Sequence, residues 1–243
     1  MLGVMLAILG LTSAAHASEF SYADFDTVLV RHVHDAGVDY GALARDRAPL
    51  ERFLAATRVA HPESWARDER LAFWVNVYNA RVLDGVVRRP GLKSVLDVGK
   101  TLGVPTLGFF RERSISGGRN LSLNDIEHEI LRKGFHEPRV HFVLNCASTS
   151  CPAIPAHALR AATLDSTLNE AARVFLLDPA KNRLQPASNR RLSSIFKWYR
   201  GDFEAAAGSL PAFLRMHWRG AEPIRDDEPI HFLSYDWSLN GHW

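Results

Sequence analysis

The sequence predicts a mostly helical α+β domain with a small β-sheet. The chain has 243 residues, of which 47% are hydrophobic and 23% charged, as in ordinary globular proteins. Helical apolar spacing recurs along the chain, whereas segments of strand character are few and do not alternate regularly with the helices, which favours α+β over a doubly wound sheet. No internal repeat or long linker is found, so we expect residues 18–243 to form a single domain.

The first residues differ from the rest of the chain. Residues 1–12 are almost wholly apolar, and SAAHA at residues 13–17 ends in the small-x-small pattern of a signal-peptidase site. The apolar run is too short to span a bilayer, and no Lys or Arg precedes it; the alternative is a buried N-terminal helix. We expect residues 1–17 to be a signal peptide and the mature protein to be periplasmic or secreted, with no membrane span.

The N-terminal half is expected to be mainly helical. Residues 68–87 form the strongest helix, and because this segment is apolar most of the way round, it should be buried. Pro90 and Gly91 end it, and residues 94–118 should hold short strands or loops. Earlier in the chain we expect helices over residues 22–34 and 49–57, with an extended piece at residues 38–40 between them.

The second half begins with a helix from Ser122 to about Lys133, in which Ser122 can cap the helix and Asp125 suits its dipole. Val140–Asn145 is the best strand of the chain, because it is apolar and is bounded by Pro138 and a loop rich in small residues. The remaining expected elements are helices over residues 164–177, 193–207 and 210–218, a hairpin over residues 183–192 and a final strand over residues 229–236.

The charge pattern excludes one class of partner. Formal net charge is +2, from 29 basic and 27 acidic residues, and the arginines are spread along the chain. Nucleic-acid binding would require a clustered basic face, so we expect no nucleic-acid partner. We also expect no cofactor and no metal, because the His and Cys spacing matches no standard zinc pattern.

The segment VHFVLNCASTSCP at residues 140–152 gathers the chemistry. The predicted strand delivers Cys146 to its end, where a turn of small hydroxyl residues follows before Cys151. Backbone N–H groups stay accessible in such a turn, as an oxyanion site requires. We therefore predict Cys146 as a nucleophile and Ser148 and Cys151 as substrate-binding residues.

A thiol near neutral pH needs a base to become a nucleophile, and two histidines are candidates. His141 lies on the same strand as Cys146 but shares its face only if the strand ends or bends before the cysteine. His128 lies on the preceding helix, where Asp125, three residues earlier, could orient the ring. Glu127 could reach the site across a helix contact.

Each of these residues has a structural alternative. Cys146 and Cys151 are the two cysteines of an expected exported protein, so a disulfide between them is the alternative to a free thiol. His141 could be a hydrogen-bonded core residue, and His128 a surface residue. Redox exchange is disfavoured because the spacing is not Cys-x-x-Cys.

Polar residues of two other segments could likewise have either a structural or a functional role. Asn76 and Asn79 lie inside the nearly all-apolar helix and must find partners. They either tie the helix to neighbouring loops or contact substrate beside the thiol. Near the end of the chain, the aromatic residues at 198, 199 and 203 are expected in the core, and Asp202 is expected to cap a helix or pair locally.

Four blocks of the chain resemble one family. They are LAFWVNVYNA at 71–80, DIEHEILR at 125–132, VHFVLNCASTSCP at 140–152 and LSSIFKWYRGDF at 192–203. In this order they resemble the domain of unknown function 547 (DUF547), which occurs in exported bacterial proteins and, with leucine-zipper regions, in plants. The resemblance covers about residues 68–203. It implies a bacterial exported member and places five residues in the family pattern: Glu127, His128, His141, Cys146 and Cys151.

Two functional hypotheses follow. The first is an exported cysteine-dependent hydrolase or acyl transferase acting on an amide or ester bond (peptide, γ-glutamyl or isopeptide) of a small-molecule or peptide substrate. Cys146 would attack the carbonyl carbon, with His128 or His141 as base and Glu127 or Asp125 orienting the imidazole. The base then precedes the nucleophile along the chain, an order that resembles permuted papain-like enzymes. The alternative is a non-catalytic periplasmic module with a Cys146–Cys151 disulfide, which binds a peptide, a cell-wall fragment or a partner protein.

Overall fold

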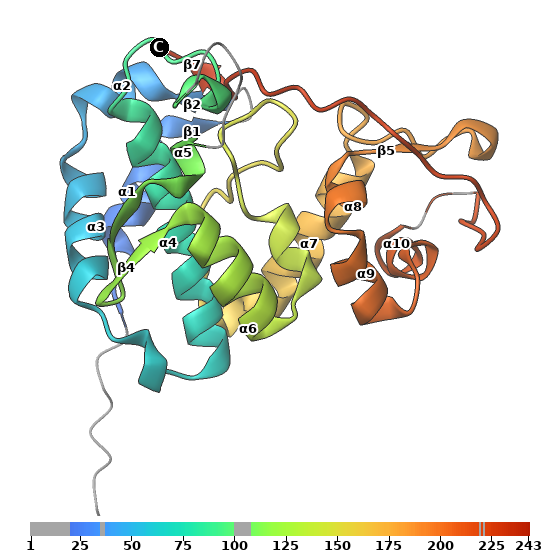
Figure 1. Ribbon diagram of the computed structural model, residues 1–243, viewed down its shortest axis with the longest axis horizontal. Coiled ribbons are helices and arrows are strands. Elements are labelled where there is room, and N and C mark those ends of the chain that lie inside the picture. Colours follow the sequence, from blue (N-terminus) through green and yellow to red (C-terminus); the bar gives the residue numbers. More distant parts are fainter. Residues whose placement is uncertain (1–19, 35–36, 100–107, 219, 221) are drawn as a thin grey trace, which may run out of the picture.

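Helix α4 (Arg67–Val87) is the centre of the fold, and its residues are buried almost continuously from Leu71 to Val87. This confirms the helix predicted over residues 68–87. Figure 1 shows α1, α3 and α4 in one half of the molecule and α8, α9 and α10 in the other. The computed structural model describes residues 20–34, 37–99, 108–218, 220 and 222–243, so the predicted signal peptide lies outside the described residues.

The N-terminal helices pack around α4 and form the larger hydrophobic core with it. Apolar residues at helical spacing in these helices face this core, as the sequence pattern predicts. Their bounds are α1 (Ala23–His32), α2 (Tyr40–Arg45) and α3 (Ala48–Val59), followed by the short helices η1 (Pro62–Ser64), η2 (Val95–Asp97) and α5 (Gly108–Arg111).

The strands are short and form small separate sheets, as the α+β class predicts. The first sheet has the order β1-β2-β7, in which β1 (Val33–His34) and β2 (Gly37–Asp39) are antiparallel and β7 (Gly241–His242) runs parallel to β2. The other two sheets pair β3 (Arg113–Ser116) with β4 (Arg119–Ser122) and β5 (Arg191–Leu192) with β6 (His231–Phe232).

A second hydrophobic core lies in the C-terminal half, around Phe142 and Phe203. Helix α7 (Leu164–Leu177) matches its predicted bounds and packs against this region. The predicted helix over residues 193–207 is divided at Tyr199 into α8 (Ile195–Trp198) and α9 (Arg200–Ala207). Helix α10 (Leu210–His217) and the short helices η5 (Ala161–Thr163) and η6 (Ala187–Asn189) complete the half.

The strand prediction over Val140–Asn145 was wrong. The chain forms the 3₁₀-helix η4 (Pro138–Phe142) and then an irregular segment. Pro138 stands at the start of η4, and the Glu137 carboxylate accepts a hydrogen bond from the Arg139 N–H. A short apolar run that is buried on all sides has no periodicity that distinguishes a strand from other buried structure, so the apolar pattern alone did not justify the strand prediction.

Two further strand predictions were only partly right. The predicted hairpin over residues 183–192 is reduced to a single antiparallel bridge between Arg183 and Arg191, with η6 in the place of a tight turn. The final strand, predicted over residues 229–236, is limited to the two residues of β6.

The helix that follows Ser122 is wound more widely than predicted. Ser122 caps it as expected, because its Oγ accepts from the Asp125 N–H at 3.0 Å and the Asp125 carboxylate accepts from the Ser122 N–H at 2.9 Å. From Asp125 to Arg132 the chain forms the π-helix η3, and α6 (Lys133–Phe135) continues it. Such π-helical turns are rare and occur frequently at functional sites.

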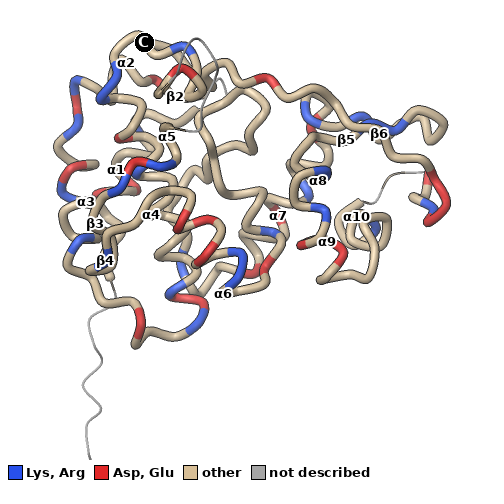
Figure 2. The backbone as a smooth tube through the Cα atoms, viewed as in Figure 1, with Lys and Arg blue, Asp and Glu red and all other residues tan. Residues whose placement is uncertain are grey.

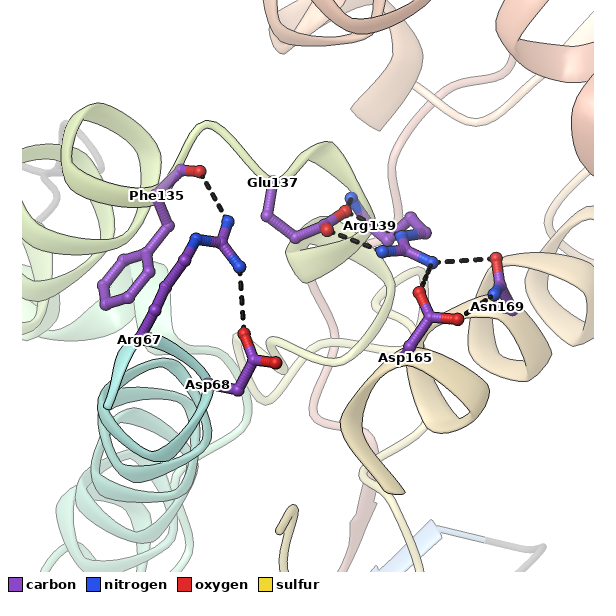
Figure 3. A network of polar contacts seen from close by, with 7 residues as sticks. All are labelled: Arg67, Asp68, Phe135, Glu137, Arg139, Asp165 and Asn169. Carbon is purple, nitrogen blue, oxygen red and sulfur yellow. Dashed lines mark hydrogen bonds and ion pairs between the residues drawn. The ribbon is translucent and has the colours of Figure 1, made fainter. Parts of the chain in front are cut away.

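Polar contacts join η4 to its neighbours (Figure 3). Arg139 binds both carboxylate oxygens of Glu137 at 2.6–2.7 Å and reaches α7 through Asp165 at 2.8 Å and Asn169 at 2.9 Å. The network therefore fixes the segment that leads into Cys146 against α7.

A C-terminal segment, residues 231–243, runs from the α8–α10 half back to β2 (Figure 1). It contacts the loop after Cys146, where the Thr149 N–H donates to the Ser238 carbonyl at 2.8 Å and the Asn240 N–H donates to the Ala147 carbonyl at 3.1 Å. Gly37 has φ +111, and a Cβ there would lie 2.3 Å from the Asn240 carbonyl oxygen. Glycine is therefore required where this segment docks.

Acidic and basic residues are interspersed over the fold, whereas residues 143–155 carry no charged side chain (Figure 2). Within the described part of the chain, no helix has the length and apolar character needed to cross a membrane.

Candidate functional site

A pocket of about 410 Å³ lies between the two halves of the fold. It is mainly apolar, and its size is within the usual range of small-ligand sites. Its walls are aromatic and aliphatic, with polar groups supplied by η3, η4 and the loop after η4. The pocket contains five of the predicted site residues, namely Glu127, His128, His141, Cys146 and Cys151.

Cys146 and Cys151 form a disulfide in the wall of this pocket. Cys146 is half-buried, whereas Cys151 is 5% exposed. Tyr235 and Ser148 lie beside both sulfur atoms, with the Tyr235 hydroxyl 3.3 Å from Cys146 Sγ and 3.1 Å from Cys151 Sγ. Of the two alternatives stated above for the cysteines, a free Cys146 thiol or a disulfide, the structure contains the disulfide.

Buried amides hold the loop that carries the disulfide. The Asn79 side chain donates to the Val143 carbonyl at 2.8 Å and accepts from the Asn145 N–H at 3.0 Å. Asn145 is itself 1% exposed, and its carboxamide binds the Pro152 carbonyl at 2.6 Å and the Ala147 N–H at 2.7 Å. Both ends of the loop are therefore tied to α4 or to each other through asparagine side chains.

Glu127 binds two tyrosines and, among the residues that the structure describes, forms no hydrogen bond with a histidine. One carboxylate oxygen accepts from the Tyr78 hydroxyl at 3.1 Å and the other from the Tyr199 hydroxyl at 2.5 Å. Burial, followed by the Glu127 charge, raises the pKa of both tyrosines, so both hydroxyls remain protonated donors. The predicted role of Glu127 in orienting a histidine is not what the contacts show.

Asp202 orients His141 instead. Its Oδ2 lies 2.8 Å from His141 Nε2, and the same carboxylate binds Arg132 through two hydrogen bonds of 2.6 and 2.9 Å. The His141 ring is stacked on Tyr199 with 3.8 Å between ring centroids. Burial lowers the pKa of His141, although the hydrogen bond to Asp202 acts in the opposite direction. Burial alone would raise the pKa of Asp202, but the hydrogen bonds from His141 and Arg132 outweigh it and hold that pKa well below its usual value.

His128 is turned towards a different partner from the one predicted. Its Nδ1 lies 2.9 Å from Arg132 Nη1. Since a guanidinium only donates, Nδ1 accepts, and the ring proton of neutral His128 is on Nε2. Asp125, the predicted orienting group, binds Ser122 and Arg113 and not His128. Among the described residues, neither His128 nor His141 forms a hydrogen bond with a cysteine sulfur.

The predicted substrate-binding residues are distributed unequally. Cys151 lines the pocket, whereas Ser148 is fully buried behind the disulfide, 2.8 Å from Cys146 Sγ. Asn76 and Asn79 do not line the pocket. The Asn76 side-chain N–H donates to the Leu159 carbonyl and its Oδ1 accepts from the Leu159 N–H, each at 2.9 Å. Each asparagine therefore ties α4 to a loop, which is the structural alternative stated above.

Sequence reasoning missed the aromatic mouth of the pocket. Trp198 was expected in the core but is 47% exposed, and it contacts Tyr235 and Trp237 with ring centroids 4.7 and 5.8 Å apart. Asp202 was expected to pair locally but binds residues 61 and 70 positions away. The detectable signal was an unusual density of aromatic residues beside one acid at residues 198–203 and again at residues 235–237.

Replacing Asp202 should make the stability of the protein depend less on pH. The Asp202 carboxylate has a lower pKa in the folded state than in the unfolded state, so it stabilises the fold above about pH 4 and loses this effect as the pH falls further. We expect Asp202→Asn to cost about 1–2 kcal/mol of unfolding free energy at neutral pH, allowing for partial exposure, and less in acid. Urea unfolding at a series of pH values measures the difference.

Asp165→Asn is the matched control for this substitution, because Asp165 also pairs with an arginine but its side chain is 80% exposed. It should change the unfolding free energy by less than about 1 kcal/mol. A difference between Asp202→Asn and wild type that stays constant from neutral pH into acid would contradict the role given to the Asp202 carboxylate.

Fold and site together define a mostly helical α+β protein with an aromatic pocket that is lined by a disulfide and, in part, by the C-terminal segment. Residues 62–176 match the sequence profile of the family described as "Protein of unknown function, DUF547". Three of the four blocks quoted above lie within the matched residues, and the block at residues 192–203 lies beyond them. Searches of curated proteins and of solved structures found no match.

Proposed function

We propose that the protein is a ligand-binding module whose pocket takes a small organic molecule or a short peptide with an apolar body. The observation that carries the proposal is the pocket itself, about 410 Å³ in volume, walled by aromatic side chains and a closed Cys146–Cys151 disulfide. Pockets of this size, mostly apolar with a few fixed polar groups, are typical of small-ligand sites. Glu127, held by two tyrosines, is the polar group that would orient the ligand.

We propose in addition that the module acts outside the cytoplasm, in the periplasm or after secretion. Two features support this. A signal peptide is predicted over residues 1–17 and would direct export. The disulfide is of the kind that persists in oxidising compartments.

The cysteine-dependent hydrolase or acyl transferase is a second candidate for the reduced protein. It is favoured by the placement of Cys146 in the same pocket as Glu127 and the two histidines. It requires reduction of the disulfide, and also a movement that brings an imidazole to the sulfur, because Arg132 and Asp202 hold the two rings in other contacts. The binding module requires neither change and is therefore preferred.

Binding of the neutral fluorophore N-phenylnaphthylamine to the unreduced protein tests the proposal. We expect saturable binding with one site per chain, because the pocket offers apolar walls and the fluorophore carries no charge. Trp198→Ala removes one wall of the mouth and should weaken binding by at least about fivefold, since an aromatic contact contributes about 1 kcal/mol. A fluorescence titration measures both constants.

Met216→Ala is the control, because Met216 is a similarly exposed large apolar residue, at 58%, that does not line the pocket. It should leave the affinity unchanged. Equal weakening by both substitutions, or binding that never saturates, would indicate nonspecific adsorption to apolar surface and contradict the proposal.

A further inference from the structure

The two sulfur atoms of the disulfide have different surroundings. Cys146 is half-buried and is the more exposed of the pair, whereas Cys151 is 5% exposed. Both line the pocket, so a ligand in it lies beside the S–S bond. Attack by an incoming group is therefore easier at Cys146 Sγ, and Cys151 Sγ would be the departing atom.

Hydrogen-bond donors are gathered around Cys151 Sγ. The backbone N–H of Cys146 donates to it at 2.8 Å, the Tyr235 hydroxyl at 3.1 Å and the Ser148 hydroxyl at 3.6 Å. The two hydroxyls are also within reach of Cys146 Sγ, at 3.3 and 2.8 Å, but the backbone N–H serves Cys151. The donor set thus favours Cys151 as the sulfur that accepts negative charge.

These donors matter more for a thiolate than for a disulfide. Hydrogen bonds to a charged acceptor are roughly twice as strong as those to a neutral one, and donors already in place cost no reorganisation when charge develops. Burial raises the pKa of Tyr235, so its hydroxyl stays a donor. The Glu127 carboxylate opposes an incoming anion, but each of its oxygens already accepts a tyrosine hydroxyl, which disperses its charge.

We infer that the pocket binds thiol compounds with an apolar body and that its disulfide exchanges with them, with Cys146 as the sulfur attacked and Cys151 as the leaving thiolate. This inference rests on the proposed binding function and specifies the chemical class of its ligand. It departs from the sequence expectation against redox exchange, which considered only the spacing of the cysteines and not the surroundings of their sulfur atoms. The ligand thiolate forms a bond to Cys146 Sγ as the Cys146–Cys151 bond breaks, and the electron pair of that bond leaves on Cys151 Sγ. Solvent takes the ligand's thiol proton beforehand and later supplies one to Cys151.

A second thiolate completes the reaction. It attacks the ligand sulfur of the mixed disulfide, Cys146 leaves as a thiolate, and the ligand departs as its disulfide. The ligand is thereby oxidised and the protein disulfide reduced, one disulfide per chain. The apolar walls select the thiol, since they contact its body and gain nothing from a small hydrophilic thiol.

The test is exchange between the full-length oxidised protein and benzyl mercaptan, quenched with acid, alkylated with N-ethylmaleimide and mapped by peptide mass. We expect early samples to carry the benzyl thiol on Cys146 and the maleimide on Cys151. The rate should exceed that of 2-mercaptoethanol by about tenfold at equal concentration, a preference of about 1.4 kcal/mol for the apolar body.

Tyr235→Phe removes one donor to the leaving sulfur and should slow exchange by at least about tenfold, because a hydrogen bond to a charged acceptor is stronger than one to a neutral acceptor. Tyr22→Phe is the matched control, a tyrosine of the larger core outside the pocket, and should leave the rate unchanged. The benzyl adduct on Cys151, equal rates for the two thiols, or no effect of Tyr235→Phe would each overturn the inference.

An unreactive analogue separates this inference from the binding function. Benzyl methyl sulfide has the same body but cannot exchange, and it should displace N-phenylnaphthylamine from the pocket. Displacement without any adduct from benzyl mercaptan would leave the binding function standing and refute thiol exchange. Adducts without displacement, formed equally fast by both thiols, would refute both.

Discussion

Asn79→Ala should lower the unfolding free energy by about 2–5 kcal/mol, although the residue lies outside the pocket. The substitution leaves the Val143 carbonyl and the Asn145 N–H without their partner, and each buried unsatisfied polar group costs about 1–3 kcal/mol. Asn79 is 1% exposed, so solvent does not replace the lost bonds. Urea unfolding followed by far-ultraviolet circular dichroism measures the change.

Asn124→Ala provides the comparison, because Asn124 is an exposed asparagine at the start of the neighbouring helix. It should alter the unfolding free energy by less than about 0.5 kcal/mol. If Asn79→Ala cost no more than Asn124→Ala, the amide of Asn79 would not hold the disulfide loop, and another element would have to fix Cys146.

Arg190→Ala, in the C-terminal half of the fold, should lower the unfolding free energy by about 3–5 kcal/mol, as expected when one partner of a buried ion pair is removed. Arg190 is 2% exposed and pairs with Glu228, whose side chain is 6% exposed, at 2.7 Å. Its guanidinium also donates to the backbone carbonyls of Leu184, Glu222 and Pro223 at 2.8–3.1 Å. The variant leaves the carboxylate buried without a cation. Thermal and urea unfolding provide the measurement.

The double variant Arg190→Ala, Glu228→Gln isolates the charge. Removing the stranded carboxylate should recover at least about 1 kcal/mol relative to Arg190→Ala, because an uncompensated buried charge costs more than a neutral amide. If the double variant were the less stable of the two, the loss in Arg190→Ala would come from the carbonyl contacts and not from the ion pair.

Local patterns predicted the long helices well. Residues 68–87 and 164–177 were predicted almost to the residue. The first is a long apolar run ended by Pro90 and Gly91, and the second has apolar residues at helical spacing on one face. The prediction of a strand over residues 140–145 was wrong because the backbone groups of this segment bond to side chains and within η4, and not to a neighbouring strand. An amide 60 or more residues away, such as Asn79 for Val143 and Asn145, leaves no trace in local periodicity.

The candidate site was predicted by composition and only partly by geometry. The cysteines, Glu127 and both histidines do line one pocket. The partners of Glu127 and His141 could not be foreseen, because they depend on how Tyr199 and Asp202 return to η3 and η4. The bridged state of the cysteines was one of two readings, and spacing alone did not decide between them.

The docking of residues 231–243 has a consequence for the order in which the molecule assembles. The Tyr40 hydroxyl donates to Asn240 at 2.7 Å across a separation of 200 residues, so this contact closes one of the largest loops in the chain. Contacts between distant residues incur their loop-closure entropy before they stabilise anything, and they form slowly. The helices around α4 can gather from nearby residues, whereas Tyr235 and Trp237 reach the pocket only when this distant segment docks. A folding intermediate with native helix content but no affinity for ligand is therefore expected, and binding should recover later than circular dichroism.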